Sequence, residues 1–235
     1  MRITTVLFDL DGTLLPMDQD EFVKCYFGHL AKKAAPYGYN AEELVAAVWK
    51  GSGAMVKNDG SVTNEVAFWN TFCKMFGEQA INDKPIFDDF YKNEFLNAQD
   101  VCGYTEDAAA VVSLAKEKGL RVALATNPIF PAVATKHRIM WAGLDVSDFE
   151  LYTTYENSSH SKPNLDYYRD VTAKLGVDPK ECLMVGNDVS EDAIAQKLGM
   201  NVFVLTDCII NKENIDISDI PNGNFSDLME YIRSL

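Results

Sequence analysis

Short apolar runs of strand length recur along the chain. The first covers residues 4–8, and others cover 121–126, 181–185 and 201–205, with a weaker candidate at 151–154. Nearly continuous apolar runs of this length are typical of parallel strands that are covered on both faces. The pattern therefore predicts four central strands in one parallel sheet.

Segments with apolar residues at helical spacing lie ahead of the three later strands. They cover residues 106–118, 164–175 and 191–198, and a glycine follows each of them. Glycine often ends a helix because it adopts the left-handed conformation without a steric penalty. This alternation predicts an α/β fold with a Rossmann-like, doubly wound parallel sheet.

One long interval, from Pro16 to Gln99, has no convincing strand pattern. It contains four helix-like stretches, at residues 18–34, 41–57, 63–76 and 84–97. A crossover between parallel strands needs only about a dozen residues, so an excursion of this length indicates a separate small domain. We therefore expect a catalytic core made of residues 1–15 and 101–235, with a helical domain inserted over residues 16–100.

Aromatic residues gather at helical spacing within this interval, notably around Phe68 to Phe76 and Phe87 to Phe95. Such spacing is typical of the buried face of a helix. We expect most of these rings to form the core of the inserted domain and some to line its inner face.

Composition narrows the class of protein. The hydrophobic fraction is 47% and the charged fraction 24%, as in ordinary globular proteins. Twenty-one basic residues against 35 acidic ones leave a net charge of −14, which repels nucleic acids and acidic membranes. A phosphate ester would also be repelled, so a site for one requires a local cation or a cluster of donors.

The cysteines and the N-terminal segment indicate a cellular compartment. There are five cysteines, an odd number, without a C-x-x-C pair, so we expect reduced thiols and no zinc site. The chain passes from Met1 almost directly into an apolar run, without the layout of a signal peptide, and it has no apolar stretch of membrane-spanning length. These features predict a cytoplasmic protein.

The first segment with candidate chemistry is D-L-D-G-T, which follows the first predicted strand. If the chain stays extended, Asp9 and Asp11 point the same way at the strand end, where α/β proteins bind ligands. One acid can then attack as a nucleophile while the other transfers a proton. A hairpin is disfavoured because residues 14–16 do not resume an alternating strand, and Gly12 comes too early for a calcium-binding loop.

A second segment, A-T-N-P, closes the strand at 121–126. The hydroxyl of Thr126, the amide of Asn127 and nearby backbone N–H groups could hold phosphate oxygens there. Asn-Pro is also ordinary turn chemistry, so this segment alone is compatible with a purely structural role.

A third segment, S-K-P-N, lies in a polar loop just ahead of a helix that Asn164 could cap. Lys162 could supply the positive charge that an acidic site and an anionic substrate both require. Taken by itself, a lysine is more often solvated surface.

A fourth segment, G-N-D-V-S-E-D, follows the strand at 181–185. Asp188 and Asp192 are four residues apart, so in the first turn of a helix they share a face and could bind one hard cation such as Mg²⁺. Acids at this place also complement the helix dipole, which is the structural alternative.

Together, F-D-L-D-G-T, A-T-N, S-K-P and V-G-N-D-V-S-E-D closely resemble the four motifs of the haloacid dehalogenase-like hydrolases, over about residues 3–15 and 102–205. The resemblance implies that Asp9 attacks phosphorus to form an aspartyl-phosphate. It implies that Asp11 protonates the leaving alcohol and then activates water. Thr126 and Lys162 would hold the transferring phosphoryl group, and Lys162 would also balance the charge of Asp9.

The resemblance also implies a magnesium site made of the Asp9 carboxylate, the Asp11 backbone carbonyl and Asp188, with Asp192 acting through water. One position departs from the commoner pattern, because Asn187 stands where an acid usually follows the glycine. The direct ligand could therefore be shifted by one position, and we assign it to Asp188.

The function that the sequence predicts is a magnesium-dependent phosphatase for a small phosphorylated metabolite, with the helical insertion acting as the family's cap. The family's dehalogenases lack the second acid, so Asp11 favours phosphoryl transfer over carbon–halogen cleavage. Two alternatives remain: a sugar phosphomutase of the same architecture, and a catalytically retired binding or regulatory protein. The second is disfavoured because the residues that the chemistry needs are all present: Asp9, Asp11, Thr126, Lys162, Asp188 and Asp192.

Overall fold

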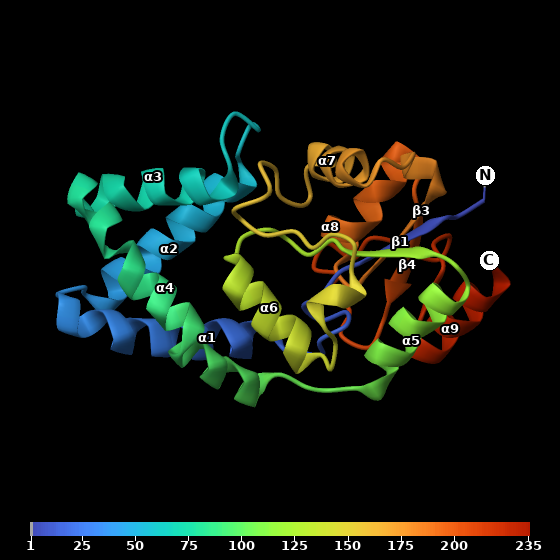
Figure 1. Cartoon of the computed structure of the whole chain (residues 1–235), viewed down its shortest axis with the longest axis horizontal. Coiled ribbons are helices and arrows are strands. Elements are labelled where there is room, and N and C mark those ends of the chain that lie inside the picture. The colour runs from blue at the N-terminus through green and yellow to red at the C-terminus, as the bar shows by residue number, and fades with distance from the viewer. Residues whose placement is uncertain (1) are drawn as a thin grey trace.

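A five-stranded parallel sheet lies at the centre of one half of the computed structural model, which describes residues 2–235 (Figure 1). The strands are β1 (Thr5–Phe8), β2 (Arg121–Leu124), β3 (Cys182–Gly186), β4 (Asn201–Leu205) and β5 (Asn222–Gly223). Their order in the sheet is β2-β1-β3-β4-β5. All neighbouring strands are parallel, which confirms the predicted parallel sheet.

The register brings the carboxyl ends of the three central strands level. Phe8, the last residue of β1, pairs with Leu124 on one side and with Val185 on the other. Because the side chains that follow these strands emerge at the same edge of the sheet, segments far apart in sequence meet there.

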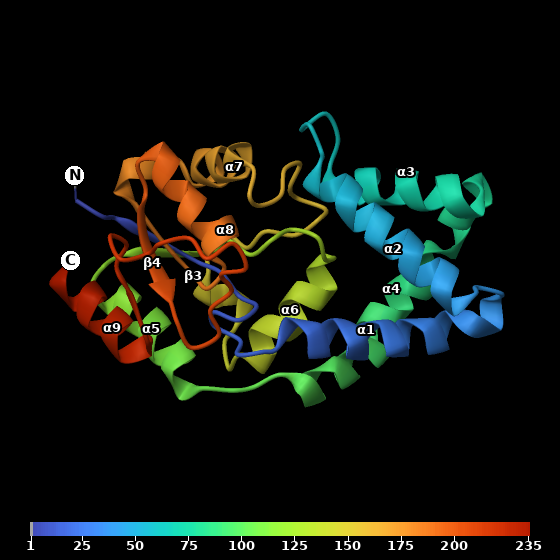
Figure 2. The ribbon, with the colours of Figure 1, turned by 180° about the vertical axis from the view of Figure 1, so that it is seen from behind.

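Helices cover both faces of the sheet, as a doubly wound fold requires (Figures 1 and 2). One face carries α5 (Glu106–Glu117) and α9 (Phe225–Ser234), and the other carries α7 (Leu165–Leu175), α8 (Val189–Asp192) and the 3₁₀ segment η6 (Ala193–Leu198). Along β1, Val6 and Phe8 belong to one buried cluster and Leu7 to the other. This alternation follows from the two-residue period of a strand.

A lobe of helices occupies the other half of the molecule (Figure 2). It consists of α1 (Gln19–Ala34), η1 (Ala35–Tyr37), α2 (Ala41–Val56), α3 (Asn64–Phe76), η2 (Glu78–Asp83), α4 (Lys84–Lys92) and η3 (Glu94–Val101). The side chains of Asp18, Asn40 and Thr63 cap its first three long helices. The helices predicted at 18–34, 41–57 and 63–76 are confirmed, whereas the fourth ends at Lys92 and continues as a 3₁₀ segment.

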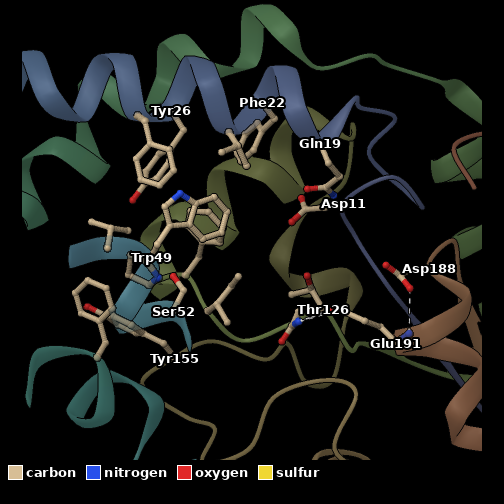
Figure 3. A pocket seen from close by; sticks show the side chains of 18 of the residues that line it. Asp11, Gln19, Phe22, Tyr26, Trp49, Ser52, Thr126, Tyr155, Asp188 and Glu191 are labelled. Carbon is tan, nitrogen blue, oxygen red and sulfur yellow. Dashed lines mark hydrogen bonds between the residues drawn. The ribbon is translucent and has the colours of Figure 1, made fainter. Parts of the chain in front are cut away.

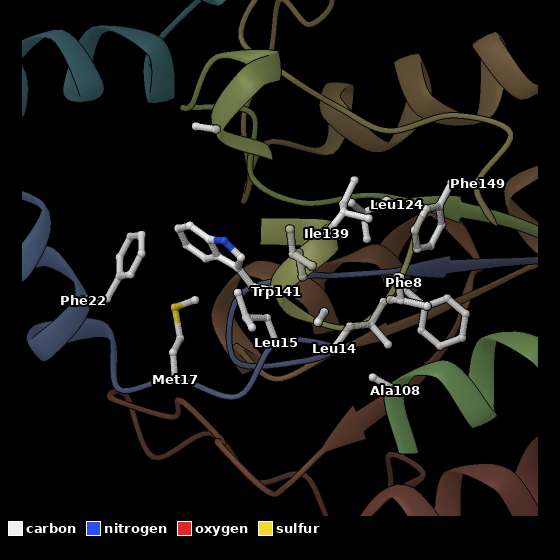
Figure 4. Close-up of a cluster of buried hydrophobic side chains, with 14 of the residues drawn as sticks. Phe8, Leu14, Leu15, Met17, Phe22, Ala108, Leu124, Ile139, Trp141 and Phe149 are labelled. Carbon is white, nitrogen blue, oxygen red and sulfur yellow. The ribbon is translucent and has the colours of Figure 1, made fainter. Parts of the chain in front are cut away.

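The apolar core runs without a break from the sheet into this lobe (Figure 4). Leu14 and Leu15, directly after the D-L-D-G-T segment, are fully buried beside Phe8 and Ile139, and Phe22 of α1 belongs to the same cluster. Burial of this loop fixes how the chain leaves β1.

Three details of the fold differ from the sequence prediction. The helix expected at residues 191–198 is instead the end of the short α8 followed by the 3₁₀ segment η6. Residues 151–154 form no strand. Their pairing with the sheet is limited to one isolated bridge between Tyr152 and Leu124. The short strand β5 was not predicted. Between residues 2 and 235 no helix is long and apolar enough to cross a membrane.

The connections between these elements also contain helical segments. They are α6 (Ala132–Trp141), η4 (Val146–Asp148) and η5 (Pro179–Glu181). The helix α6 starts shortly after the A-T-N-P segment and lies between the sheet edge and the helical lobe (Figure 1).

Candidate active site

A cavity of about 430 Å³ lies where the carboxyl edge of the sheet faces the helical lobe (Figure 3). Six of the seven side chains singled out from the sequence line it: Asp9, Asp11, Thr126, Asn127, Asp188 and Asp192. The seventh, Lys162, lies behind Asp9 and is 1% exposed. The fold therefore gathers in one place residues that span most of the sequence.

Lys162 forms two buried ion pairs. Its Nζ is 2.9 Å from Asp9 Oδ1 and 2.6 Å from Asp192 Oδ1. Burial alone would lower the pKa of Lys162, but the Asp192 and Asp9 carboxylates outweigh it and hold the pKa well above its usual value. The lysine therefore stays charged and compensates two carboxylates.

Asp9 is held by the loop that follows it. Its Oδ2 accepts a hydrogen bond from Thr13 Oγ1 at 3.2 Å, and the same hydroxyl lies 3.1 Å from Asn187 Oδ1. Gly12 allows this packing: its φ is +81°, and a Cβ there would lie 2.2 Å from Asn187 Nδ2. Neither Thr13 nor the packing role of Gly12 was predicted from the sequence.

Asp11 is paired with Arg138, a residue that belongs to none of the four sequence motifs. The guanidinium donates to Asp11 Oδ2, is fully buried, and lies 4.4 Å above the ring of Phe130. The other oxygen, Asp11 Oδ1, is buried and has no hydrogen-bond partner within residues 2–235. Burial raises the pKa of Asp11, although Arg138 opposes the rise.

Thr126 and Asn127 occupy the end of β2. The Thr126 backbone oxygen accepts hydrogen bonds from Thr153 Oγ1 at 2.6 Å and Tyr167 Oη at 2.9 Å, while its side chain faces the cavity (Figure 3). Asn127 Nδ2 donates to both carboxylate oxygens of Glu191 at 3.0 Å. Burial raises the pKa of Glu191, which also lines the cavity, to about 7.

Asp188 and Asp192 have different surroundings. Asp188 Oδ1 accepts from the backbone N–H groups of Ser190 at 2.9 Å and Glu191 at 3.0 Å, so this carboxylate caps α8. Asp192 is 1% exposed, and its Oδ2 accepts from the Asp188 N–H at 3.1 Å. Helix capping, the structural alternative, is thus part of what Asp188 does, although its carboxylate also lines the cavity.

The side chain of Asn187 is held by contacts within the protein. Its Nδ2 donates to the Cys208 carbonyl at 2.7 Å and its Oδ1 faces Thr13 Oγ1. This arrangement supports Asp188 over its neighbour as the residue available to a cation.

The donor set fits a magnesium ion better than a metal held by side chains alone. Across the described residues, no three His, Cys, Asp or Glu side chains are grouped closely enough to form such a site. Asp9 and Asp188 supply two carboxylates on the cavity wall. Magnesium typically takes one or two carboxylates and completes its shell with water and phosphate oxygens.

The helical lobe touches the loops that carry these groups. Asn64, the first residue of α3, is fully buried and its Nδ2 donates to the Pro128 carbonyl at 3.1 Å and to Ser161 Oγ at 3.0 Å. These partners lie next to Asn127 and Lys162 in the sequence, so the lobe and the sheet edge are joined directly at the site.

A family model and curated relatives match most of the chain. The family model "haloacid dehalogenase-like hydrolase" matches residues 3–198. Hexitol phosphatase A of Escherichia coli is 28% identical over 95% of this chain and 98% of its own length. Pyrophosphatase PpaX of Bacillus pumilus is 25% identical over 84% of this chain and 80% of its own.

Solved structures show the same fold. A predicted phosphoglycolate phosphatase from Haemophilus somnus superposes with a TM-score of 0.61 at 20% identity, covering 98% of both chains. L-2-haloacid dehalogenase from Xanthobacter autotrophicus gives a TM-score of 0.60 at 16% identity, covering 99% of both.

Proposed function

The chain belongs to the haloacid dehalogenase-like hydrolases, and from this we propose that it is a magnesium-dependent phosphatase acting on a small phosphorylated metabolite through a phosphorylated Asp9. The observation that carries the proposal is the pair of carboxylates, Asp9 and Asp11, in one cavity with a different buried cation beside each. Relatives named as phosphatases support it. Asp11 distinguishes the chain from the dehalogenases of the family.

In the first step, an Asp9 oxygen attacks phosphorus while the bond from phosphorus to the alcohol oxygen breaks. Lys162 and Thr13 each bind one oxygen of the Asp9 carboxylate and so restrict its rotation. A carboxylate held in one orientation is placed for attack from one direction. Thr126 and Asn127, at the end of β2, are placed to bind the oxygens of the transferring group.

Asp11 moves the protons. Burial raises its pKa, so the carboxyl can carry a proton to the leaving alcohol, after which Arg138 stabilises the carboxylate that remains. In the second step Asp11 takes a proton from water as the water oxygen bonds to phosphorus. Cleavage of the bond between phosphorus and Asp9 then releases phosphate and restores both acids.

The residues that would hold magnesium are Asp9 and Asp188 through their carboxylates and Asp11 through its backbone carbonyl. A bound magnesium ion would offset the negative charge of these groups and of the phosphoryl oxygens. Asp192 orients the site, because it accepts from the Asp188 N–H and pairs with Lys162. Any contact of Asp192 with the ion would pass through water.

The proposal includes a division of labour within the chain. Residues 1–15 and 101–235 would form the catalytic core, and residues 16–100 a cap that opens and closes over the cavity during turnover. The contact of Asn64 with the loops at Pro128 and Ser161 supports a closed arrangement. On the sequence grounds given above, the proposed location is the cytoplasm.

The test is release of p-nitrophenol from p-nitrophenyl phosphate by the whole chain, with magnesium and with a chelator, for wild type and Asp188→Asn. We expect activity that requires magnesium, and a variant that needs a higher magnesium concentration or loses activity. Equal rates with metal and with chelator would contradict the proposed cofactor. Interconversion of sugar phosphate isomers without release of phosphate would favour a phosphomutase.

A further inference from the structure

The part of the cavity remote from Asp9 is walled by aromatic rings. We propose that the substrate is a phosphate monoester whose alcohol carries a flat aromatic or heteroaromatic group. This inference rests on the proposed function and specifies the substrate class of the same site.

The cavity has two chemically different ends (Figure 3). Asp11, Thr126 and Asp188 lie at one end, and Tyr26 and Trp49 lie at the other. A monoester bound with its phosphate beside the carboxylates would therefore direct its alcohol portion toward the rings.

The wall at the far end is built from rings more than from aliphatic side chains. Phe22, Tyr26, Trp49, Phe68, Trp69 and Tyr155 contribute to it from three helices and a loop. Gly51 makes room for one of them, since a Cβ there would lie 2.5 Å from Phe68 Cδ2. Rings prefer offset or edge-on contact with other rings, so this wall suits a flat partner.

The neutral polar side chains on the cavity wall are fewer than its rings, and they include Gln19, Ser52 and the hydroxyl of Tyr155. The hydroxyls of Tyr26 and Tyr91, both on the wall, bond to each other at 2.8 Å. The indole N–H of Trp69 is buried and has no partner in the described part of the chain. Rings make up most of this wall, so a flat ring would gain contact with them, whereas a chain of hydroxyls would give up hydrogen bonds to water against apolar surface.

The charges on the wall disfavour a second anionic group. Beyond the carboxylates at the sheet edge, the wall carries the acidic residues Asp20 and Asp88, and its one basic residue is the exposed Lys212. A second phosphate or a carboxylate would be placed near negative charge without a buried cation to offset it. The chemistry of this wall is therefore unlike that expected for pyrophosphate or a hexitol phosphate.

The experiment compares kcat/KM for 2-naphthylmethyl phosphate, cyclohexylmethyl phosphate, sorbitol 6-phosphate and pyrophosphate. The first three release primary alcohols, so differences in leaving-group chemistry are small. We expect the naphthylmethyl ester to exceed each of the others by about tenfold or more, since a few well-placed contacts change specificity by that factor.

A matched pair of variants tests where the preference arises. Trp49 lines the cavity and is 54% exposed, while Tyr37, also in the helical lobe, is 57% exposed and lies outside the cavity. We expect Trp49→Ala to lower kcat/KM for the naphthylmethyl ester about tenfold, mainly through KM, and to leave sorbitol 6-phosphate almost unchanged. Tyr37→Ala should change neither.

The inference is overturned if sorbitol 6-phosphate, pyrophosphate or the cyclohexylmethyl ester is hydrolysed as well as the naphthylmethyl ester. It is also overturned if Trp49→Ala lowers all rates equally. A calorimetric measurement of the affinity for 2-naphthylmethyl phosphonate, which cannot be hydrolysed, tests the aromatic site independently of the proposed phosphatase activity. Selective binding of the aromatic phosphonate without hydrolysis of any ester would contradict the proposed phosphatase and support the aromatic site. Hydrolysis of all the esters at similar rates would support the phosphatase and contradict the aromatic site.

Discussion

At the scale of single residues, the candidate site contains two buried cations, each facing a different carboxylate. Lys162 pairs with Asp9, and Arg138 pairs with Asp11. The lysine was predictable because it lies in a short polar motif directly before a capped helix. The arginine was not, because it lies in the last turn of α6, where a basic residue is common, and no local pattern distinguishes it from an exposed arginine.

Replacing Arg138 should cost stability in a pH-dependent way. In Arg138→Met the Asp11 carboxylate would be left buried and unpaired, so we expect the free energy of unfolding to fall by about 3–5 kcal/mol at pH 7.5. Because the pKa of Asp11 is raised in the folded state, acidification lets the folded variant bind a proton and recover part of the loss. Urea unfolding at pH 7.5 and pH 5 measures this.

The control is Arg169→Met, which removes an exposed pair with Asp166 and should cost less than about 1 kcal/mol at either pH. Equal losses in the two variants, or a loss in Arg138→Met that grows at pH 5, would be incompatible with a buried ion pair.

At the scale of elements, the sequence predicted the glycines that follow helices but not the glycine that closes β3. The helices expected to end at Gly119 and Gly176 do so, whereas the segment that ends at Gly199 is a 3₁₀ helix; the three glycines have positive φ values of 75°, 65° and 83°. Strand β5 could not be predicted because it has two residues and no alternation. The role of Gly186 was also hidden, since it depends on contact with a side chain six positions later.

Gly186 closes β3 at a point where no side chain fits. A Cβ there would lie 2.0 Å from Asp192 Oδ2, so Gly186→Ala should displace the carboxylate that orients Asp188 and pairs with Lys162. We expect kcat to fall by about 100-fold, since a displacement of about 1 Å is enough for such a loss.

Gly28→Ala is the matched substitution, because a Cβ at this position in α1 would have no atom within 4 Å. It should keep full activity and raise the free energy of unfolding by about 0.5–1 kcal/mol. Steady-state kinetics together with thermal unfolding compares the two, and full activity in Gly186→Ala would show that Asp192 tolerates displacement.

At the scale of the whole molecule, the proposed function requires a chain with a net charge of −14 to attract an anionic substrate. Alternation of strands and helices was enough to predict the sheet, and the long strand-free interval predicted the helical lobe. The shape of the cavity between the sheet and the lobe could not be predicted. Hydrophobic periodicity indicates which helix faces are buried, but it does not indicate which of those faces line a cavity.

The overall charge gives a prediction about salt. Long-range repulsion of a dianionic ester should be screened as ionic strength rises from about 10 to 150 mM, whereas the buried contacts with Lys162 are screened much less. We therefore expect kcat/KM to rise with salt at fixed magnesium. Potassium gluconate in place of sodium chloride controls for specific ion effects. A steady fall with either salt would mean that long-range attraction by local cations dominates.

The central claim is that Asp9 is the nucleophile, and the most direct measurement is magnesium-dependent phosphate release by Asp9→Asn beside Asp20→Asn. Both acids line the same cavity, but Asp20 lies on α1 and is exposed. Loss of a nucleophile should lower kcat by about 10⁴-fold or more in Asp9→Asn, while Asp20→Asn keeps a rate close to that of the wild type. Undiminished release by a correctly folded Asp9→Asn would contradict the account.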